Sequence, residues 1–163
     1  MKKSILLVTL CITTWAWSQV PTSDPLFQTL KKMDSLIFDI GFNECRTEVY
    51  NTFVAEDLEF YHDQAGVTNN REGFLASVKN NICGNSEVKN RRELREGSLQ
   101  VFPLYNNGKL YGAIQTGEHR FFQKRENQPE QAGSTALFTH LWLKQKKTWV
   151  LKRVLSYAHH NTP

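Results

Sequence analysis

Two residues that can act in acid–base chemistry stand together at the end of a predicted strand. The run DLEFYHD, residues 57–63, alternates between faces as a strand does and ends in His62 and Asp63. A carboxylate buried beside aromatic rings has a raised pKa and can remove a proton next to a carbonyl group. His140 is the third candidate catalytic residue, because a histidine beside a carboxylate can act as acid or base. The alternative for Asp63 is structural, because an aspartate before Gln64-Ala65-Gly66 commonly opens a turn.

The alternation of this strand leaves open which side chains point inward. Tyr61 and Asp63 share one face, and Phe60 and His62 share the other. If Leu58, Phe60 and His62 form the core face, His62 lies in the interior, whereas Tyr61 and Asp63 point away. The sequence alone does not decide between these two arrangements.

A predicted hairpin, with strands 134–144 and 148–159 joined by a tight turn, carries most of the aromatic residues of interest. One face of its first strand has Phe138, His140 and Trp142. One face of its second strand runs from Trp149 to His159 in steps of two. Aromatic rings with polar groups set among them suit the wall of a small-molecule pocket. The candidate ligand-binding residues are therefore Tyr61, Glu118, Trp142, Trp149, Arg153, Tyr157 and His159.

Other kinds of site find less support in the sequence. An ion pair between Arg153 and Glu118 could orient a ligand carboxylate or be purely structural. Ser156 is not part of a GxSxG elbow, so a serine hydrolase is not expected. No GxGxxG or GKS/T loop is present, so no nucleotide cofactor is expected. His62, Asp63, His140 and His159 are metal ligands by type only, without HxH, HExxH or CxxC spacing, so no metal is predicted.

The N-terminal residues predict export. Residues 1–18 combine Lys2-Lys3, an apolar run and Ala16-Trp17-Ser18, which is the layout of a signal peptide cleaved before Gln19. We expect a periplasmic or extracellular protein without a membrane anchor after cleavage. Two cysteines, Cys45 and Cys83, then remain, and in an oxidising compartment they are expected to form a disulfide.

The composition fits one globular domain that does not bind nucleic acid. The 163 residues are 40% apolar and 22% charged, which allows a single domain with a real core. Loss of Lys2 and Lys3 with the signal peptide lowers the net charge from +4 to +2. This charge is too small for electrostatic binding of nucleic acid.

The order of predicted elements is helices first and strands afterwards. Residues 19–24 form a leader, and residues 25–160 form the domain. Asp24 and Pro25 start an amphipathic helix that Gly41 ends or bends. A short helix at 47–54 and a third helix after Asn69 follow, with Asn69 and Glu72 resembling a capping box. Strands are predicted at 57–63, 93–104, 110–124, 134–144 and 148–159. This is an α+β domain with three N-terminal helices packed on a curved, mostly antiparallel sheet.

Several local runs carry a family resemblance over about residues 26–160. They are DLEFYHD at 57–63, GSL at 97–99, YGAIQ at 111–115, FTHLW at 138–142 and LKRVLSY at 151–157. Together they resemble a secreted bacterial branch of the nuclear transport factor 2-like superfamily, a domain of unknown function (4440 type) related to SnoaL-like polyketide cyclases. The resemblance implies a cone, or cystatin-like roll, whose sheet wraps a pocket closed by the helices. It also places a pocket acid at Asp63 and implies a homodimer through the outer sheet face.

The superfamily holds isomerases, dehydratases, cyclases and non-catalytic binding modules, so the fold does not decide the function. Our first hypothesis is an exported domain that binds a small, partly apolar molecule in an internal pocket. The second is a cofactor-free isomerase, dehydratase or cyclase with an Asp/His acid–base pair. The third is a structural dimeric module whose interior is filled by its own side chains.

Overall fold

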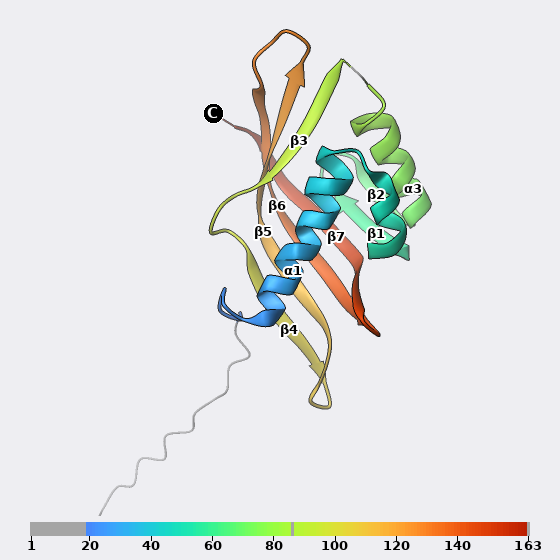
Figure 1. The fold of residues 1–163 in the computed structure, drawn as a ribbon, viewed down its shortest axis with the longest axis vertical. Coiled ribbons are helices and arrows are strands. Elements are labelled where there is room, and N and C mark those ends of the chain that lie inside the picture. Colours follow the sequence, from blue (N-terminus) through green and yellow to red (C-terminus); the bar gives the residue numbers. More distant parts are fainter. Residues whose placement is uncertain (1–18, 86, 163) are drawn as a thin grey trace, which may run out of the picture.

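The computed structural model describes residues 19–85 and 87–162, which form one mixed sheet with helices on one face (Figure 1). The order of the strands in the sheet is β2-β1-β7-β6-β5-β3, and β4 also pairs with β5. The strands are β1 (Val54–His62), β2 (Gly66–Thr68), β3 (Val88–Leu94), β4 (Gln100–Asn106), β5 (Lys109–Arg125), β6 (Gln131–Gln145) and β7 (Thr148–Asn161). All pairings are antiparallel except that of β1 with β7, which is parallel. The predicted α+β class is confirmed.

Helix α1 (Pro25–Ser35) crosses the concave face of the sheet and continues as the wider helix η1 (Leu36–Asn43) (Figure 1). Asp24 caps α1 as predicted, since its side chain accepts from the backbone N–H of Leu26 at 2.7 Å. Leu30, Met33 and Ile37 of this segment are buried against the sheet. The remaining helical pieces are η2 (Thr47–Val49), α2 (Tyr50–Phe53), α3 (Arg71–Ser77) and η3 (Val78–Ile82).

Gly41 neither ends nor sharply interrupts the first helical segment. A Cβ atom at this position would lie 2.6 Å from the ring of Tyr50, so only glycine lets α2 pack this closely on η1. The buried hydroxyl of Tyr50 donates to the carbonyl of Ile37 at 3.2 Å. The glycine therefore serves the contact between two helices.

Two predicted boundaries are wrong. The single strand predicted at 93–104 is two strands, β3 and β4, which pair with different parts of the long strand β5. The chain turns between them at residues 95–99. The residue that caps α3 is Asn70, whose side chain accepts from the N–H of Gly73 at 2.7 Å, and not Asn69. Neighbouring asparagines at a helix start offer the same chemistry, so the sequence could not separate them.

Two β-bulges set which residues of β7 face the helices. Trp142 pairs with Leu151 and Leu141 pairs with Arg153, so Lys152 is an extra residue. Beyond this bulge Val154 and Ser156 are buried, and Leu155 and Tyr157 are exposed. The face predicted to run from Trp149 to His159 is therefore interrupted after Leu151. A second bulge, at Ala158 with a φ of 57°, returns His159 to the inner face.

The expected disulfide is confirmed. Cys45 and Cys83 are bonded and lie 38 residues apart in the sequence, so the bond ties the end of η1 to the end of η3. The predicted signal peptide, residues 1–18, lies outside the described residues. Within the predicted leader, the N–H of Val20 donates to the carbonyl of Val101 at 2.9 Å. Among residues 19–85 and 87–162, no helix has both the length and the apolar character to cross a membrane.

Candidate functional site

A groove between α1 and β3 leads from the surface to a buried ion pair. Its volume is about 680 Å³, which lies in the range of small-molecule pockets. Asp34 of α1 and Arg92 of β3 are the buried polar residues in its lining. The wall also includes apolar and charged side chains, among them Phe27, Gln28, Lys31, Arg91, Leu94, Arg95 and Leu99.

The ion pair is a two-point contact. Nη1 and Nη2 of Arg92 lie 2.7 and 3.1 Å from the two carboxylate oxygens of Asp34, and both side chains are at most 4% exposed. The guanidinium group also lies 4.1 Å from the ring centroid of Phe38. Burial raises the pKa of Asp34, and the charge of Arg92 opposes this. A neutral Asp34 would leave the buried guanidinium group without a counter-charge, which favours the ionised carboxyl group.

His119 of β5 lies behind Arg92. The Nε–H of Arg92 donates to Nδ1 of His119 at 3.3 Å, which places the proton of the neutral imidazole on Nε2. This Nε2 is buried and has no hydrogen-bond partner among the described residues. Burial, with a smaller effect of the Arg92 charge, lowers the pKa of His119 to about 2. The side chain is therefore a neutral donor at physiological pH.

His140 of β6 is held in the opposite tautomer to that of His119. Gln115 donates from Nε2 to the carbonyl of Leu30, so its Oε1 faces Nε1–H of Trp142 at 2.7 Å and Nδ1 of His140 at 3.4 Å. This arrangement places the His140 proton on Nδ1 and leaves Nε2 as an acceptor without a partner in the described part of the chain. Burial lowers the pKa of His140 well below its ordinary value. The two histidines thus leave one donor and one acceptor unused in the interior, and Nε of Arg120 is a further buried donor without a partner among the described residues.

A second polar cluster lies where β1 ends beside β7. Asp63 accepts from the backbone N–H of His159 at 3.1 Å, and its other oxygen lies 2.5 Å from Nδ1 of His159. The ring of His62 stacks on that of His159 with centroids 4.3 Å apart. Burial opposes ionisation of Asp63, but the bonds from His159 outweigh it and lower the pKa of Asp63. Burial and the charge of His159 lower the pKa of His62.

The other predicted site residues lie neither in the groove between α1 and β3 nor in the polar cluster at the end of β1. Trp142 and Trp149 are buried in the core, and Tyr61 and Tyr157 are exposed on the outer sheet face. The ion pair between Arg153 and Glu118 is not formed. Arg153 instead pairs with Glu59 at 2.7 Å, and Glu118 pairs with Arg95 at 2.6 Å, because the β-bulge turns Arg153 outward.

For β1, the structure resolves which face points inward. His62 is half-buried on the inner side, whereas the Tyr61 side chain is exposed and donates to Glu59. Asp63 follows the last residue of β1, so strand alternation no longer applies to it. Of the three candidate catalytic residues, His62 and Asp63 lie together with His159, and His140 lies apart in the interior.

The sequence analysis missed Asp34, Arg92, His119 and Gln115. One signal was available, because Asp34 follows Leu30 by four positions and Ile37 follows Asp34 by three, which places an acid on the apolar stripe of α1. A carboxylate in such a stripe needs a buried cation as its partner. The sequence offers many arginines, and only the pairing of β3 with β5 shows which of them is the partner.

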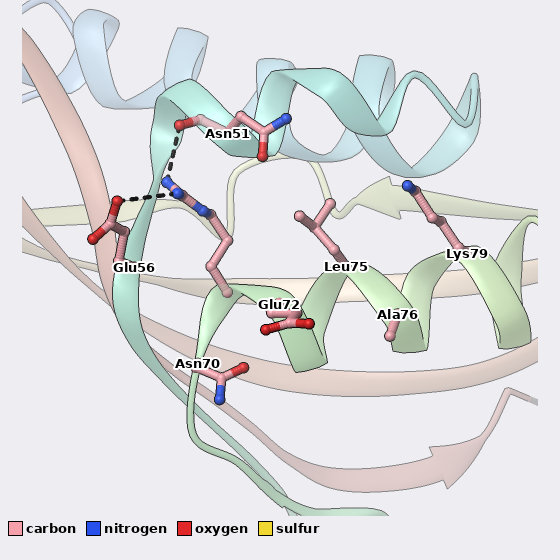
Figure 2. A pocket seen from close by; sticks show the side chains of 8 residues that line it. Asn51, Glu56, Asn70, Glu72, Leu75, Ala76 and Lys79 are labelled. Atoms are coloured by element: carbon pink, nitrogen blue, oxygen red, sulfur yellow. Dashed lines mark hydrogen bonds and ion pairs between the residues drawn. The ribbon is translucent and has the colours of Figure 1, made fainter.

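A second hollow, of about 590 Å³, lies between α2 and α3 at the surface (Figure 2). Arg71 crosses it and donates to the carbonyls of Asn51 and Val54 at 3.0 and 3.1 Å. It also contacts Glu56 at 3.4 Å. These bonds tie α3 to the start of β1, so the central polar side chain of this hollow has a structural role. None of the predicted site residues lines it.

Known proteins resemble this chain in structure and not in sequence. No protein-family model matches the chain, and no curated protein is similar to it in sequence. ActVI-ORFA from Streptomyces coelicolor is 13% identical with a TM-score of 0.68, over 83% of this chain and 98% of that one. A nuclear transport factor 2-like superfamily protein from Salmonella enterica is 14% identical with a TM-score of 0.65, over 83% and 92%. A hexachlorocyclohexane dehydrochlorinase, LinA-type3 from Novosphingobium barchaimii, is 14% identical with a TM-score of 0.61, over 83% and 88%.

Proposed function

Given its nuclear transport factor 2-like fold, we propose that the domain binds a small, partly apolar molecule with a carbonyl or carboxylate oxygen in the groove between α1 and β3. The observation that supports this proposal is the groove of about 680 Å³ that reaches a buried ion pair. A guanidinium group has five N–H groups, and the bonds to Asp34 and His119 use three of those on Arg92. The other two can donate to a ligand oxygen, and Phe27 and Leu99 offer apolar surface.

Native mass spectrometry tests this proposal on protein purified from its own host. Gln28 and Thr29 are both exposed on α1, and each makes one hydrogen bond to a backbone carbonyl, but only Gln28 lines the groove. We expect the wild type to carry a small bound molecule. We expect Gln28→Trp to lose at least about nine-tenths of that species, because the ring fills the groove, a loss of the size expected when a ligand is sterically excluded.

Thr29→Trp is the matched control and is expected to keep the bound molecule. A wild type without any bound species, or a Gln28→Trp variant that carries as much as the wild type, would contradict binding in this groove.

A cofactor-free isomerase, dehydratase or cyclase is the second candidate. The hydrogen bond between Asp63 and His159 favours it, because a carboxylate that orients an imidazole is a common acid–base pair. One structure of the same fold is a dehydrochlorinase. Neither groove described above is lined by Asp63 or His159, so binding in the groove explains more of the geometry than catalysis does.

We also propose that the outer sheet face is a homodimer interface. Tyr61 pairs with Leu155 and Leu137 pairs with Tyr157 across β1, β7 and β6, and all four side chains are 39–41% exposed. Leu155→Glu is expected to convert a dimer into a monomer in analytical ultracentrifugation, since it places a charge at the centre of this patch. Lys147→Glu, in the β6–β7 turn, is the control that leaves the dimer intact. A monomeric wild type would refute the interface.

The disulfide supports export, because such bonds persist mainly in oxidising compartments. We therefore propose a periplasmic or extracellular location with cleavage before Gln19. The intact mass of the protein from its own host checks this, and a mass that includes residues 1–18 would contradict it.

A further inference from the structure

The cluster of His62, Asp63 and His159 has the composition of a metal site. One potential ligand atom from each residue lies within 4.8 Å of the other two. We propose that these three residues bind one divalent transition-metal ion, with zinc as the best match, through two imidazole nitrogens and one carboxylate oxygen. This site is separate from the groove between α1 and β3 and does not depend on ligand binding there.

The backbone brings the three residues together from strands that are far apart in the sequence. Asp63 and His159 are 96 residues apart. The parallel pairing of β1 with β7 places His62 opposite Ser156, and the N–H of Asp63 then donates to the Ser156 carbonyl at 3.1 Å. The register of two strands therefore fixes the positions of all three side chains.

The second bulge in β7, at Ala158, brings His159 into the cluster. Without an extra residue there, alternation would leave His159 on the outer face with Tyr157. Ala158 instead adopts a φ of 57°, a left-handed conformation that is unfavourable for an L-residue. The His159 side chain is consequently only 5% exposed and faces Asp63. Strain of this kind is concentrated at functional sites.

The donor set selects the class of ion. Two imidazoles and one carboxylate suit Zn²⁺, Co²⁺ and Ni²⁺, whereas Ca²⁺ and Mg²⁺ prefer oxygen ligands. Ligand atoms around tetrahedral zinc lie about 3.3 Å apart, given metal–ligand bonds of about 2.0–2.1 Å. Nδ1 of His62 already lies 3.4 Å from the carboxylate of Asp63. The contact between Nδ1 of His159 and Asp63 is shorter, 2.5 Å, and widens when an ion replaces the proton between them.

The two imidazole rings face Asp63 at a position that water can reach. Stacking of the two rings, with an angle of 13° between their planes, keeps both Nδ1 edges on the side of Asp63. The N–H of Gln64 donates to Nδ1 of His62 at 3.1 Å, and this bond is given up when the ion binds. The Asp63 side chain is 32% exposed, so water reaches the cluster and can complete the coordination.

Isothermal titration of the tag-free protein with zinc chloride tests the proposal, with Co²⁺ absorption as a second readout. We expect one Zn²⁺ per chain and the visible absorption of tetrahedral Co²⁺. Asp63→Asn is expected to weaken zinc binding at least about 10-fold, because the amide still accepts from His159 but is a poor metal ligand. His62→Gln removes an imidazole that is partly exposed and serves as the second variant if Asp63→Asn does not fold.

His160→Gln is the matched control, since His160 is an exposed histidine next to the cluster. It is expected to bind zinc as the wild type does. Binding without saturation, a stoichiometry other than one, unchanged affinity in both cluster variants, or loss of binding in His160→Gln would each overturn the proposal. Failure of this site would leave binding in the groove unaffected, because the two places share no residue.

Discussion

Arg92→Leu is expected to lower the free energy of unfolding by about 3–5 kcal/mol, because it leaves the buried carboxylate of Asp34 without its partner. The pair is at most 4% exposed, so the carboxylate left behind is poorly hydrated. The variant also removes the donor to His119 and the cation above Phe38. Urea denaturation followed by circular dichroism measures the change.

Two further variants separate this effect from a loss of packing. The double variant Asp34→Leu with Arg92→Met removes both charges and is expected to recover most of the stability, since apolar groups of similar volume replace buried pairs well. Arg95→Leu breaks an exposed pair with Glu118 and is expected to cost less than about 1 kcal/mol. If Arg92→Leu costs no more than Arg95→Leu, the buried pair does not stabilise the fold as described.

Mild acid is expected to destabilise the protein by about 4 kcal/mol between pH 7.5 and pH 5. His119 and His140 are buried and neutral, and the pKa of each is lowered by burial, to about 2 for His119. The unfolded chain takes up protons on both residues below about pH 6.5, whereas the fold does not. Each histidine therefore lowers the stability by about 1.4 kcal/mol per pH unit below that value, and stability rises with pH across this window.

The charged and titratable groups around these histidines do not reverse the direction of this pH dependence. The raised pKa of Asp34 offsets part of this loss as the pH falls, but Asp34 is a single group and its two bonds to Arg92 favour the ionised form. The lowered pKa of His62 adds to the loss with a smaller effect, because its side chain is 24% exposed. Urea denaturation at a series of pH values gives the slope. His140→Gln should halve it and His160→Gln should leave it unchanged; a pH-independent stability would show that the two histidines are not held neutral.

Local sequence patterns predicted well those features of the fold that depend only on residues close together in the sequence. Asp24 and Pro25 marked the start of α1. The buried face of Phe138, His140 and Trp142 followed from simple alternation, because the extra residue of the bulge at Leu141 and Trp142 belongs to β7 and not to β6. The pairing of Cys45 with Cys83 followed from the count of cysteines after the predicted signal peptide.

The sites depend on pairing between distant elements, and alternation alone could not find them. A single extra residue reverses the face of every residue after it, so Arg153 and Tyr157 point outward because of Lys152. Asp34 and Arg92 meet only because the end of α1 comes close to β3 in the fold, and their spacing of 58 residues carries no local signal. The cluster of His62, Asp63 and His159 was recognisable by residue type, but its geometry required the second bulge.

The position of β7 has a consequence for how the chain folds. This strand is the last of the described strands in sequence, and yet it stands between β1 and β6 in the sheet. β1 has only the three-residue strand β2 on its other side, so it cannot be incorporated stably until residues 148–161 have been synthesised and docked. The closing contacts span nearly a hundred residues, which predicts slow folding from a long-lived open chain. Late closure by β7 would keep the chain unfolded during the export proposed above.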